Sequence, residues 1–429
     1  MQRRQYNSLI KWKLSLTRKP LLIKGARQVG KTWLMKAFGK GEYEKCVYIN
    51  LESNKRLQQI FSGDFDIPRI ITALEIESSV TIEAQNTLII LDEIQEAPGA
   101  ITSLKYFYEN APEYHIISAG SLLGVALNRQ TSFPVGKVDF LELFPLSFPE
   151  FLEAKDETRL LKLLVSKDWQ LINSFKSKYI QFLKEYYYVG GMPEAVWSFV
   201  QTNNFEEARS VQKKILAAYE QDFSKHAPNE IVPRIRMLWN SIPAQLSREN
   251  KKFIYGAVKP GARSKDYELA MSWLIDCGLI HKVNRVAKPA IPLKAYEDFS
   301  AFKLFIVDTG LMSAMADVDV RTLIDGNILF QEFKGALTEQ YVLQQLISEG
   351  WSVYYWSAEN ATAEIDFLVQ GTGTLLPIEV KAEENLKAKS LKLFHQKYHP
   401  AKAFRTSMSD YREEDWLINF PLYAINELS

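Results

Sequence analysis

One eight-residue run constrains this chain more than any other feature of its sequence. Gly25-Ala26-Arg27-Gln28-Val29-Gly30-Lys31-Thr32 follows the apolar run PLLIK and precedes the helix-like TWLMKAF. The run fits G-x-x-x-x-G-K-[ST] between a strand and a helix, where backbone N–H groups surround phosphate oxygens. Lys31 can then reach the β- and γ-phosphates, and the Thr32 hydroxyl can ligate Mg²⁺. The sequence therefore predicts a nucleoside triphosphate site built from these residues.

A second motif supplies carboxylates. The apolar run Thr87–Leu91 ends in Asp92 and Glu93. A buried strand with two terminal carboxylates has the form of a Walker B segment, in which Asp92 would hold Mg²⁺ and Glu93 would orient and polarise the attacking water. An acidic end to a core strand is common by itself, so this assignment depends on the phosphate-binding run.

A third polar position follows the apolar run Tyr114–Ser118. Ser121 comes after Gly120 at the predicted carboxyl end of this strand, where it could sense the γ-phosphate or position water. Ser118 is the second choice for this catalytic role. The alternative for Ser121 is structural, because serine is a preferred N-cap residue of helices.

Changes of pattern along the 429 residues predict three domains and an α/β fold class. Over residues 20–120, short apolar runs alternate with helical stretches, as crossover units around a parallel sheet require. Residues 1–155 are assigned to this P-loop parallel-sheet core. Residues 156–330 are mostly helical and become winged-helix-like towards their end, and residues 331–429 form a small α/β domain.

The middle domain carries two further features. Gly190-Gly191-Met192-Pro193 predicts a tight turn between helices, for which a structural role is preferred. Residues 269–277 and the following LIHKV predict a helix and then a strand, which suggests the winged-helix-like unit. Lys259, Arg263 and Lys265 lie just before it and could contact a nucleic-acid backbone, although such clusters are usually solvated.

The composition narrows the classes of protein. With 52 Lys+Arg against 51 Asp+Glu, no global field draws the chain onto a polyanion. Cys46 and Cys277 form neither a CxxC nor a Cys/His spacing, so neither a disulfide framework nor a zinc site is predicted. No run approaches the ~18–20 apolar residues of a membrane span. We therefore expect a cytoplasmic protein without membrane contact.

Six segments occur in an order similar to that of a known family, the prokaryotic AAA-like ATPases with a characteristic C-terminal domain of unassigned function. They span most of the chain: GARQVGKTWLM, TLIILDEIQEAP, AGSLLGV, VGKVDFLELFPLSFPEFL, YYYVGGMPEAV and FKLFIVDTGLM. The resemblance implies ATP as the nucleotide and an AAA-like ATPase core in residues 1–155.

Carried over residue by residue, the resemblance implies four nucleotide ligands, Gly25, Gly30, Lys31 and Thr32, and two carboxylates, Asp92 for the metal and Glu93 for the water. Many relatives have an arginine where this chain has Lys137. Because lysine lacks the planar fork of arginine, no arginine finger is assigned. Arg27 is interpreted as a packing or surface residue, and both a monomer and a small oligomer stay open.

The last domain contains a predicted hairpin. Its runs EIDFLVQ and LLPIEVK flank residues 371–374, Gly-Thr-Gly-Thr. A hairpin symmetric about this turn places Asp366 opposite Glu379 and Glu364 opposite Lys381, all on one face. Directly opposed side chains lie ~4.5–5.5 Å apart at Cβ. Asp366 and Glu379 could therefore share one divalent ion.

The order of these residues is similar to the PD-(D/E)XK nuclease-like fold, with Glu339 on a helix, Asp366 on one strand and Glu379-x-Lys381 on the next. It departs from the strict motif at Ile365, where a proline would stand. Lys381 would stabilise the phosphate or assist the attacking water. A metal-binding or nucleic-acid-binding remnant and a purely structural domain with a Glu364–Lys381 ion pair stay open.

The sequence thus predicts an ATP-binding protein with Mg-dependent ATPase activity, whose nucleotide cycle controls its C-terminal domain. One alternative is an ATP-gated, metal-dependent nuclease. Another is a non-catalytic regulator whose ATP state controls binding to DNA or to a protein partner.

Overall fold

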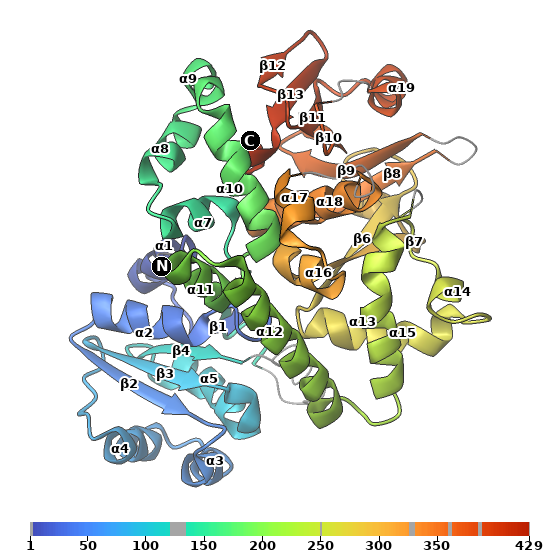
Figure 1. Cartoon of the computed structure of the whole chain (residues 1–429). Helices are drawn as coiled ribbons and strands as arrows, with labels where there is room; N and C mark the ends of the chain where they lie inside the picture. Colours follow the sequence, from blue (N-terminus) through green and yellow to red (C-terminus); the bar gives the residue numbers. More distant parts are fainter. Residues whose placement is uncertain are drawn as a thin grey trace. The chain divides into compact units, whose positions relative to one another are not determined.

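The computed structural model in Figure 1 describes residues 3–120, 134–248, 251–325, 331–358, 363–384 and 388–428. Contacts divide the chain into two compact units. The first unit consists of Gln2–Phe144 with Asp276–Leu279, and the second contains Pro145–Ile275 and Ile280–Ser429. The division into three domains stays a prediction.

A five-stranded parallel sheet forms the centre of the first unit, in the order β2-β3-β4-β1-β5. The strands are β1 (Leu21–Lys24), β2 (Lys45–Asn50), β3 (Thr87–Asp92), β4 (His115–Ala119) and β5 (Asp139–Glu142). Strands β3 and β4 are buried along their whole length, which explains their continuous apolar runs. The order confirms the predicted P-loop parallel-sheet core.

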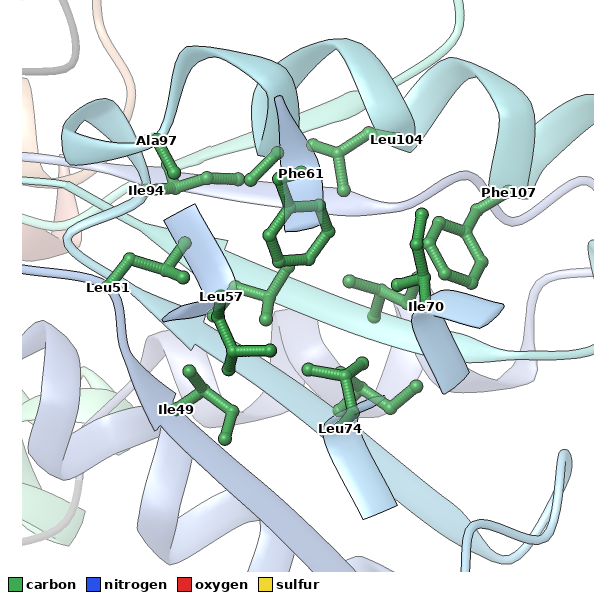
Figure 2. Close-up of a cluster of buried hydrophobic side chains, with 14 of the residues drawn as sticks. Ile49, Leu51, Leu57, Phe61, Ile70, Leu74, Ile94, Ala97, Leu104 and Phe107 are labelled. Carbon is green, nitrogen blue, oxygen red and sulfur yellow. The ribbon is translucent and has the colours of Figure 1, made fainter. Parts of the chain in front are cut away.

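Helices surround this sheet: α1 (Gln5–Leu14), α2 (Lys31–Glu42), α3 (Lys55–Phe61), α4 (Ile67–Ser78), α5 (Pro98–Asn110) and the short η1 (Ile94–Glu96). The Asn54 and Asp66 side chains cap α3 and α4 by accepting backbone N–H groups. Figure 2 shows Phe61 and Leu74 of these helices in one buried cluster with Ile49 of β2. This core fixes the strands whose carboxyl ends carry the predicted motifs.

The second unit is mostly helical in its first part. Its helices are α7 (Phe148–Ala154), α8 (Thr158–Ser166), α9 (Trp169–Ser174), α10 (Lys176–Val189), α11 (Pro193–Thr202), α12 (Phe205–His226), α13 (Val232–Leu246), α14 (Tyr255–Val258), α15 (Ser264–Asp276), α16 (Thr309–Met315), α17 (Val320–Asp325), α18 (Gln331–Ser348) and α19 (Lys389–Tyr398). The last residue of α15 belongs to the first unit.

The turn between α10 and α11 has a packing role. An added Cβ at Gly190 would lie 2.3 Å from Asp308 Oδ1, and one at Gly191 would lie 2.1 Å from the Leu146 carbonyl oxygen. The Gly191 N–H donates to Asp308 Oδ2 at 2.6 Å, and the other carboxylate oxygen caps α16 at Leu311. Three of the six segments that resemble the family, those with Leu146, Gly190-Gly191 and Asp308, therefore meet in one buried junction.

An eight-stranded sheet of order β12-β13-β11-β10-β9-β8-β6-β7 completes the second unit. Its strands are β6 (Ile280–Val286), β7 (Glu297–Ile306), β8 (Val353–Ser357), β9 (Glu364–Gly371), β10 (Thr374–Val380), β11 (Ala403–Ser407), β12 (Arg412–Glu413) and β13 (Leu417–Pro421), with η2 (Leu293–Tyr296) and η4 (Leu422–Glu427) beside them.

The hairpin of β9 and β10 has the predicted register, because Thr374 pairs with Gly371 and Ile378 pairs with Phe367. The β6–β7 hairpin joins the same sheet through β8, at Arg285 and Tyr355. Strands before and after the predicted boundary at residue 330 therefore belong to one sheet. The helix and strand predicted at 269–277 and LIHKV are present as α15 and β6, and their winged-helix interpretation stays a prediction.

Candidate functional site

The loop between β1 and α2 has a backbone that requires glycine at its two ends. Gly25 has φ +142° and Gly30 has φ +93°, both in the region that disfavours side chains. An added Cβ at Gly25 would lie 2.2 Å from the Leu143 carbonyl oxygen. The G-x-x-x-x-G spacing is thus set by packing and by backbone conformation together.

Lys31 begins α2 and its side chain turns back over the loop. Its Nζ atom donates to the carbonyl oxygens of Gly25 and Ala26, at 2.8 Å each. The residue is only 7% exposed. Burial lowers the pKa of the Lys31 ammonium to about 8, against the opposite effect of the neighbouring Glu93 and Asp92 carboxylates. A positive charge is therefore held directly against the loop.

The two predicted motifs meet at one carboxylate. The Thr32 hydroxyl donates to Asp92 Oδ2 at 2.6 Å, and the Tyr48 hydroxyl donates to the same oxygen at 3.0 Å. The other oxygen, Oδ1, accepts the Glu93 N–H at 3.1 Å. Burial and the Asp92 carboxylate raise the pKa of Tyr48 to about 12, so the phenol stays a donor.

Glu93 has a left-handed backbone, with φ +50°, directly after the last residue of β3. A residue other than glycine in this conformation costs about 1–3 kcal/mol, and such residues cluster at functional sites. The Gln95 side chain donates to Glu93 Oε2 at 2.7 Å. The carboxylate is thereby held at the same end of the sheet as Asp92.

The oxygen atoms of this site fit a magnesium ion bound with a nucleotide. Mg²⁺ takes oxygen ligands and is usually held by one or two carboxylates together with substrate phosphates. The Thr32 hydroxyl and the Asp92 carboxylate, 2.6 Å apart, are such a pair at the start of α2. The residues present therefore suit the predicted cofactors, ATP and Mg²⁺.

A second charged cluster lies around Glu339 of α18. The Lys251 ammonium is hydrogen-bonded to Glu339 Oε1, and Lys303 Nζ lies 3.7 Å from Glu339 Oε2. Lys303 is fully buried on β7 and also pairs with Glu364. Burial raises the pKa of Glu339, but Lys251 and Lys303 outweigh it, so the net shift is downward. The two lysines thus hold Glu339 ionised.

Asp366 belongs to this cluster as well. One of its oxygens accepts the Val380 N–H at 2.8 Å. Burial and the Glu339 carboxylate raise the pKa of Asp366 to about 7, while Lys303 and Lys251 act in the opposite direction. The structure therefore brings the predicted residues Glu339 and Asp366 into interaction with each other.

One predicted pair in this region is wrong. Glu364 pairs with Lys303, and Lys381 pairs instead with Glu379, with 2.9 Å between Lys381 Nζ and Glu379 Oε1. The reason is that β10 ends at Val380, so Lys381 lies beyond the strand. Across the described ranges, no three His, Cys, Asp or Glu side chains gather as a metal site. A metal at Glu339, Asp366 and Glu379 stays a prediction.

Family models cover three stretches of the chain. Residues 17–152 match the AAA domain family. Two further models, both described as domains of unknown function (DUF8612 and DUF4143), match residues 180–322 and 334–424. No curated protein matches the chain. Residues 17–152, which contain the P-loop and the Walker B strand, are therefore similar to AAA domains, and the last stretch contains Glu339, Asp366, Glu379 and Lys381.

Several solved structures align at low identity. A Walker-type ATPase of Pyrococcus abyssi aligns over 73% of this chain and 95% of its own, at 14% identity and a TM-score of 0.46. The Aeropyrum pernix Orc1 protein in complex with DNA aligns over 74% and 93%, at 12% and 0.31. AMPPCP-bound DnaA from Aquifex aeolicus aligns over 64% and 86%, at 13% and 0.27.

The other residues predicted for the AAA domain have mixed outcomes. Ser121 lies outside the described residues. Ser118 is fully buried in β4, which lies between the P-loop strand and the Walker B strand. Lys137, at the position of the arginine in many relatives, forms an ion pair with Glu109 at 3.0 Å. Catalytic roles for these residues stay predictions. Every helix among the described residues is too short or too polar to span a lipid bilayer.

Four residues of these two sites were not predicted. Tyr48 and Gln95 contact the Asp92 and Glu93 carboxylates, and Lys251 and Lys303 contact Glu339. Gln95 lies two residues beyond Glu93, so its short spacing was a usable signal. Tyr48, Lys251 and Lys303 are 44, 88 and 36 residues from their partners in the chain, and no local pattern predicts such contacts.

Proposed function

We propose that the chain binds ATP with Mg²⁺ at the P-loop of its AAA domain and hydrolyses it. The observation that carries this proposal is the 2.6 Å hydrogen bond from Thr32 to Asp92, which joins the phosphate-binding motif to the Walker B strand. An isolated glycine turn would have no reason to meet a carboxylate from a strand 60 residues away. The match of residues 17–152 to the AAA domain family supports the same conclusion.

The proposal gives each side chain a distinct task. The backbone N–H groups of residues 25–32 surround the phosphates, and Lys31 exchanges its two carbonyl acceptors for β- and γ-phosphate oxygens. Thr32 and Asp92 hold the metal, which when bound supplies positive charge to the phosphate oxygens. Glu93, held by Gln95, orients the attacking water and accepts its proton.

The test compares two lysines of the same helix. Lys31→Ala should lose affinity for a fluorescent ATP analogue by at least about 100-fold, because two or more charge-assisted hydrogen bonds disappear. Lys40→Ala, an exposed position near the end of α2, should bind and hydrolyse ATP like the wild type. Unchanged binding by Lys31→Ala would contradict the proposal.

For the C-terminal part, we favour an ATP-switched binding role over nuclease activity. Lys251 and Lys303 already neutralise the Glu339 and Glu364 carboxylates. Glu379 contacts Lys381 and pairs in register with Arg405. Cations of the protein therefore occupy the surroundings in which a nuclease would place its metal. How the nucleotide cycle controls this part, and a cytoplasmic location, stay predictions.

A cavity of about 350 Å³ favours nucleic acid as the partner. Its lining includes four cations, one carboxylate and one tryptophan: Lys389, Lys392, Arg405, Arg412, Glu414 and Trp416. Glu414 pairs with Arg412 at 3.1 Å, so the cationic side chains still outnumber the carboxylate. Arg405 is 2% exposed, so its charge is fixed inside the wall. Cationic walls contact phosphates, and an aromatic side chain can stack on a base.

One set of samples distinguishes DNA binding from nuclease activity. Linear and supercoiled DNA is incubated with Mg²⁺ or Mn²⁺, with and without ATP, and both binding and cleavage are measured. We expect binding without cleavage, weakened several-fold in Lys389→Ala/Lys392→Ala and unchanged in Lys397→Ala on the same helix. Cleavage that Asp366→Ala abolishes would instead establish the nuclease.

A further inference from the structure

The connection between α15 and β6 belongs to the first unit, which contains the P-loop, although most of α15 and all of β6 belong to the second unit. Asp276–Leu279 groups with Gln2–Phe144 in the contact pattern. This four-residue connection contains Gly278, with φ +70°, and the buried Cys277. It is therefore a covalent link from the AAA domain to one helix and one strand outside it.

Gly278 rests directly on the P-loop backbone. An added Cβ at Gly278 would lie 3.2 Å from the backbone nitrogen of Ala26, and 3.7 Å from the Ala26 Cα and the Gly25 carbonyl carbon. A contact of 3.2 Å is already tight, so one side would have to shift by a few tenths of an ångström. Close-packed contacts of this kind transmit small displacements.

A charge interaction also links Asp276 of this connection to β1, the strand before the P-loop. Lys24 is the last residue of β1 and directly precedes Gly25. Burial lowers the pKa of Lys24, and the nearby Glu142 and Asp276 carboxylates act against this. Asp276 thus stabilises the charge of Lys24, directly before the P-loop, while Gly278 contacts the backbone of the loop itself.

We propose that Asp276–Leu279 is a positioning element of the nucleotide site, which senses the P-loop backbone and links its state to α15 and β6. The inference rests on the proposed binding of ATP. Phosphate binding redirects the Lys31 side chain away from the Gly25 and Ala26 carbonyls, which are the residues that Gly278 covers. Because coupling between two sites acts in both directions, a change at Gly278 that shifts the P-loop backbone also alters nucleotide affinity.

Two glycines allow a matched test. Gly278→Ala and Gly261→Ala both place a side chain at positive φ, +70° and +77°, but an added Cβ at Gly261 has no atom within 4 Å among the described residues. We expect Gly278→Ala to weaken binding of a fluorescent ATP analogue about tenfold or more. Gly261→Ala should change it less than about twofold, because it shares the backbone strain but not the contact.

Amide hydrogen exchange on the wild-type chain gives a second readout that needs no variant to fold. A non-hydrolysable ATP analogue should slow exchange in Asp276–Leu279 and at the adjoining ends of α15 and β6. Lys31→Ala should show no such change. If the wild type binds no nucleotide, the proposed function itself fails. If it binds, but exchange in the connection is unchanged or the two alanine variants bind alike, the positioning role is wrong.

Discussion

The P-loop and the Glu339 cluster use the same ingredients, lysines and carboxylates from distant segments, in opposite ways. Lys31 donates to two neutral carbonyls of its own loop, and Asp92 accepts from hydroxyl groups. Lys251 and Lys303 instead pair directly with carboxylates. Moving Lys31 to a phosphate gives up hydrogen bonds to two uncharged carbonyl groups, whereas moving Lys303 leaves buried carboxylate charge uncompensated. The first arrangement suits ligand exchange, and the second holds the fold together.

The largest expected effect comes from removing the buried lysine. Lys303→Met should lower the free energy of unfolding by about 3–5 kcal/mol, because the Glu339 and Glu364 carboxylates lose their shared cation inside the protein. Chemical denaturation of the wild type and of Lys303→Met at neutral pH measures this difference in the free energy of unfolding.

The matched control is an exposed pair. Lys213 and Asp317 lie 3.6 Å apart with side chains 61% and 81% exposed. Lys213→Met should therefore change stability by less than about 1 kcal/mol. Equal effects of the two substitutions would show that the buried Lys303 pairs do not stabilise the fold.

Acid should destabilise the first unit, because a buried histidine becomes protonated when the chain unfolds. Burial lowers the pKa of His115 to about 4, helped by Arg18 and Lys13, and its ring nitrogen is 2.6 Å from the Tyr43 hydroxyl. The unfolded chain, with an ordinary pKa near 6.5, binds this proton first. Stability should thus be full above about pH 6.5 and fall by about 1–3 kcal/mol as the pH drops to 4.

Denaturation at several pH values, with variants, isolates this contribution. His115→Gln should flatten the dependence between about pH 6.5 and 4, whereas His399→Gln, at an exposed position, should keep the wild-type profile. A profile that His115→Gln leaves unchanged would remove this histidine from the account.

The smallest expected effect is on the Mg²⁺ dependence of hydrolysis, after removal of the Tyr48 hydroxyl. Tyr48→Phe removes one hydrogen bond to Asp92, worth about 1 kcal/mol. The Mg²⁺ concentration for half-maximal hydrolysis should therefore rise a few-fold. Tyr106→Phe, on a ring stacked against Phe65, should leave it unchanged. No difference between the two variants would mean that Tyr48 does not orient Asp92.

Local patterns predicted what local geometry determines. The strand Thr87–Asp92 and the register of Ile378 with Phe367 follow from an apolar run and a symmetric turn, and both are confirmed. The Glu364–Lys381 pair was wrong for two reasons: β10 ends at Val380, before Lys381, and Glu364 pairs with Lys303 of β7, a strand that the hairpin argument did not include. Likewise, no sequence spacing indicates that Gly278 covers Ala26.

The most direct test of the catalytic claim compares two glutamates of one short segment, Glu93→Gln and Glu96→Gln. Nucleotide binding and steady-state hydrolysis are measured on the same samples. The account predicts that Glu93→Gln binds ATP like the wild type but hydrolyses it at least about 100-fold more slowly, whereas Glu96→Gln does both normally. Wild-type turnover by Glu93→Gln would contradict the assignment of this carboxylate, and with it the proposed ATPase site.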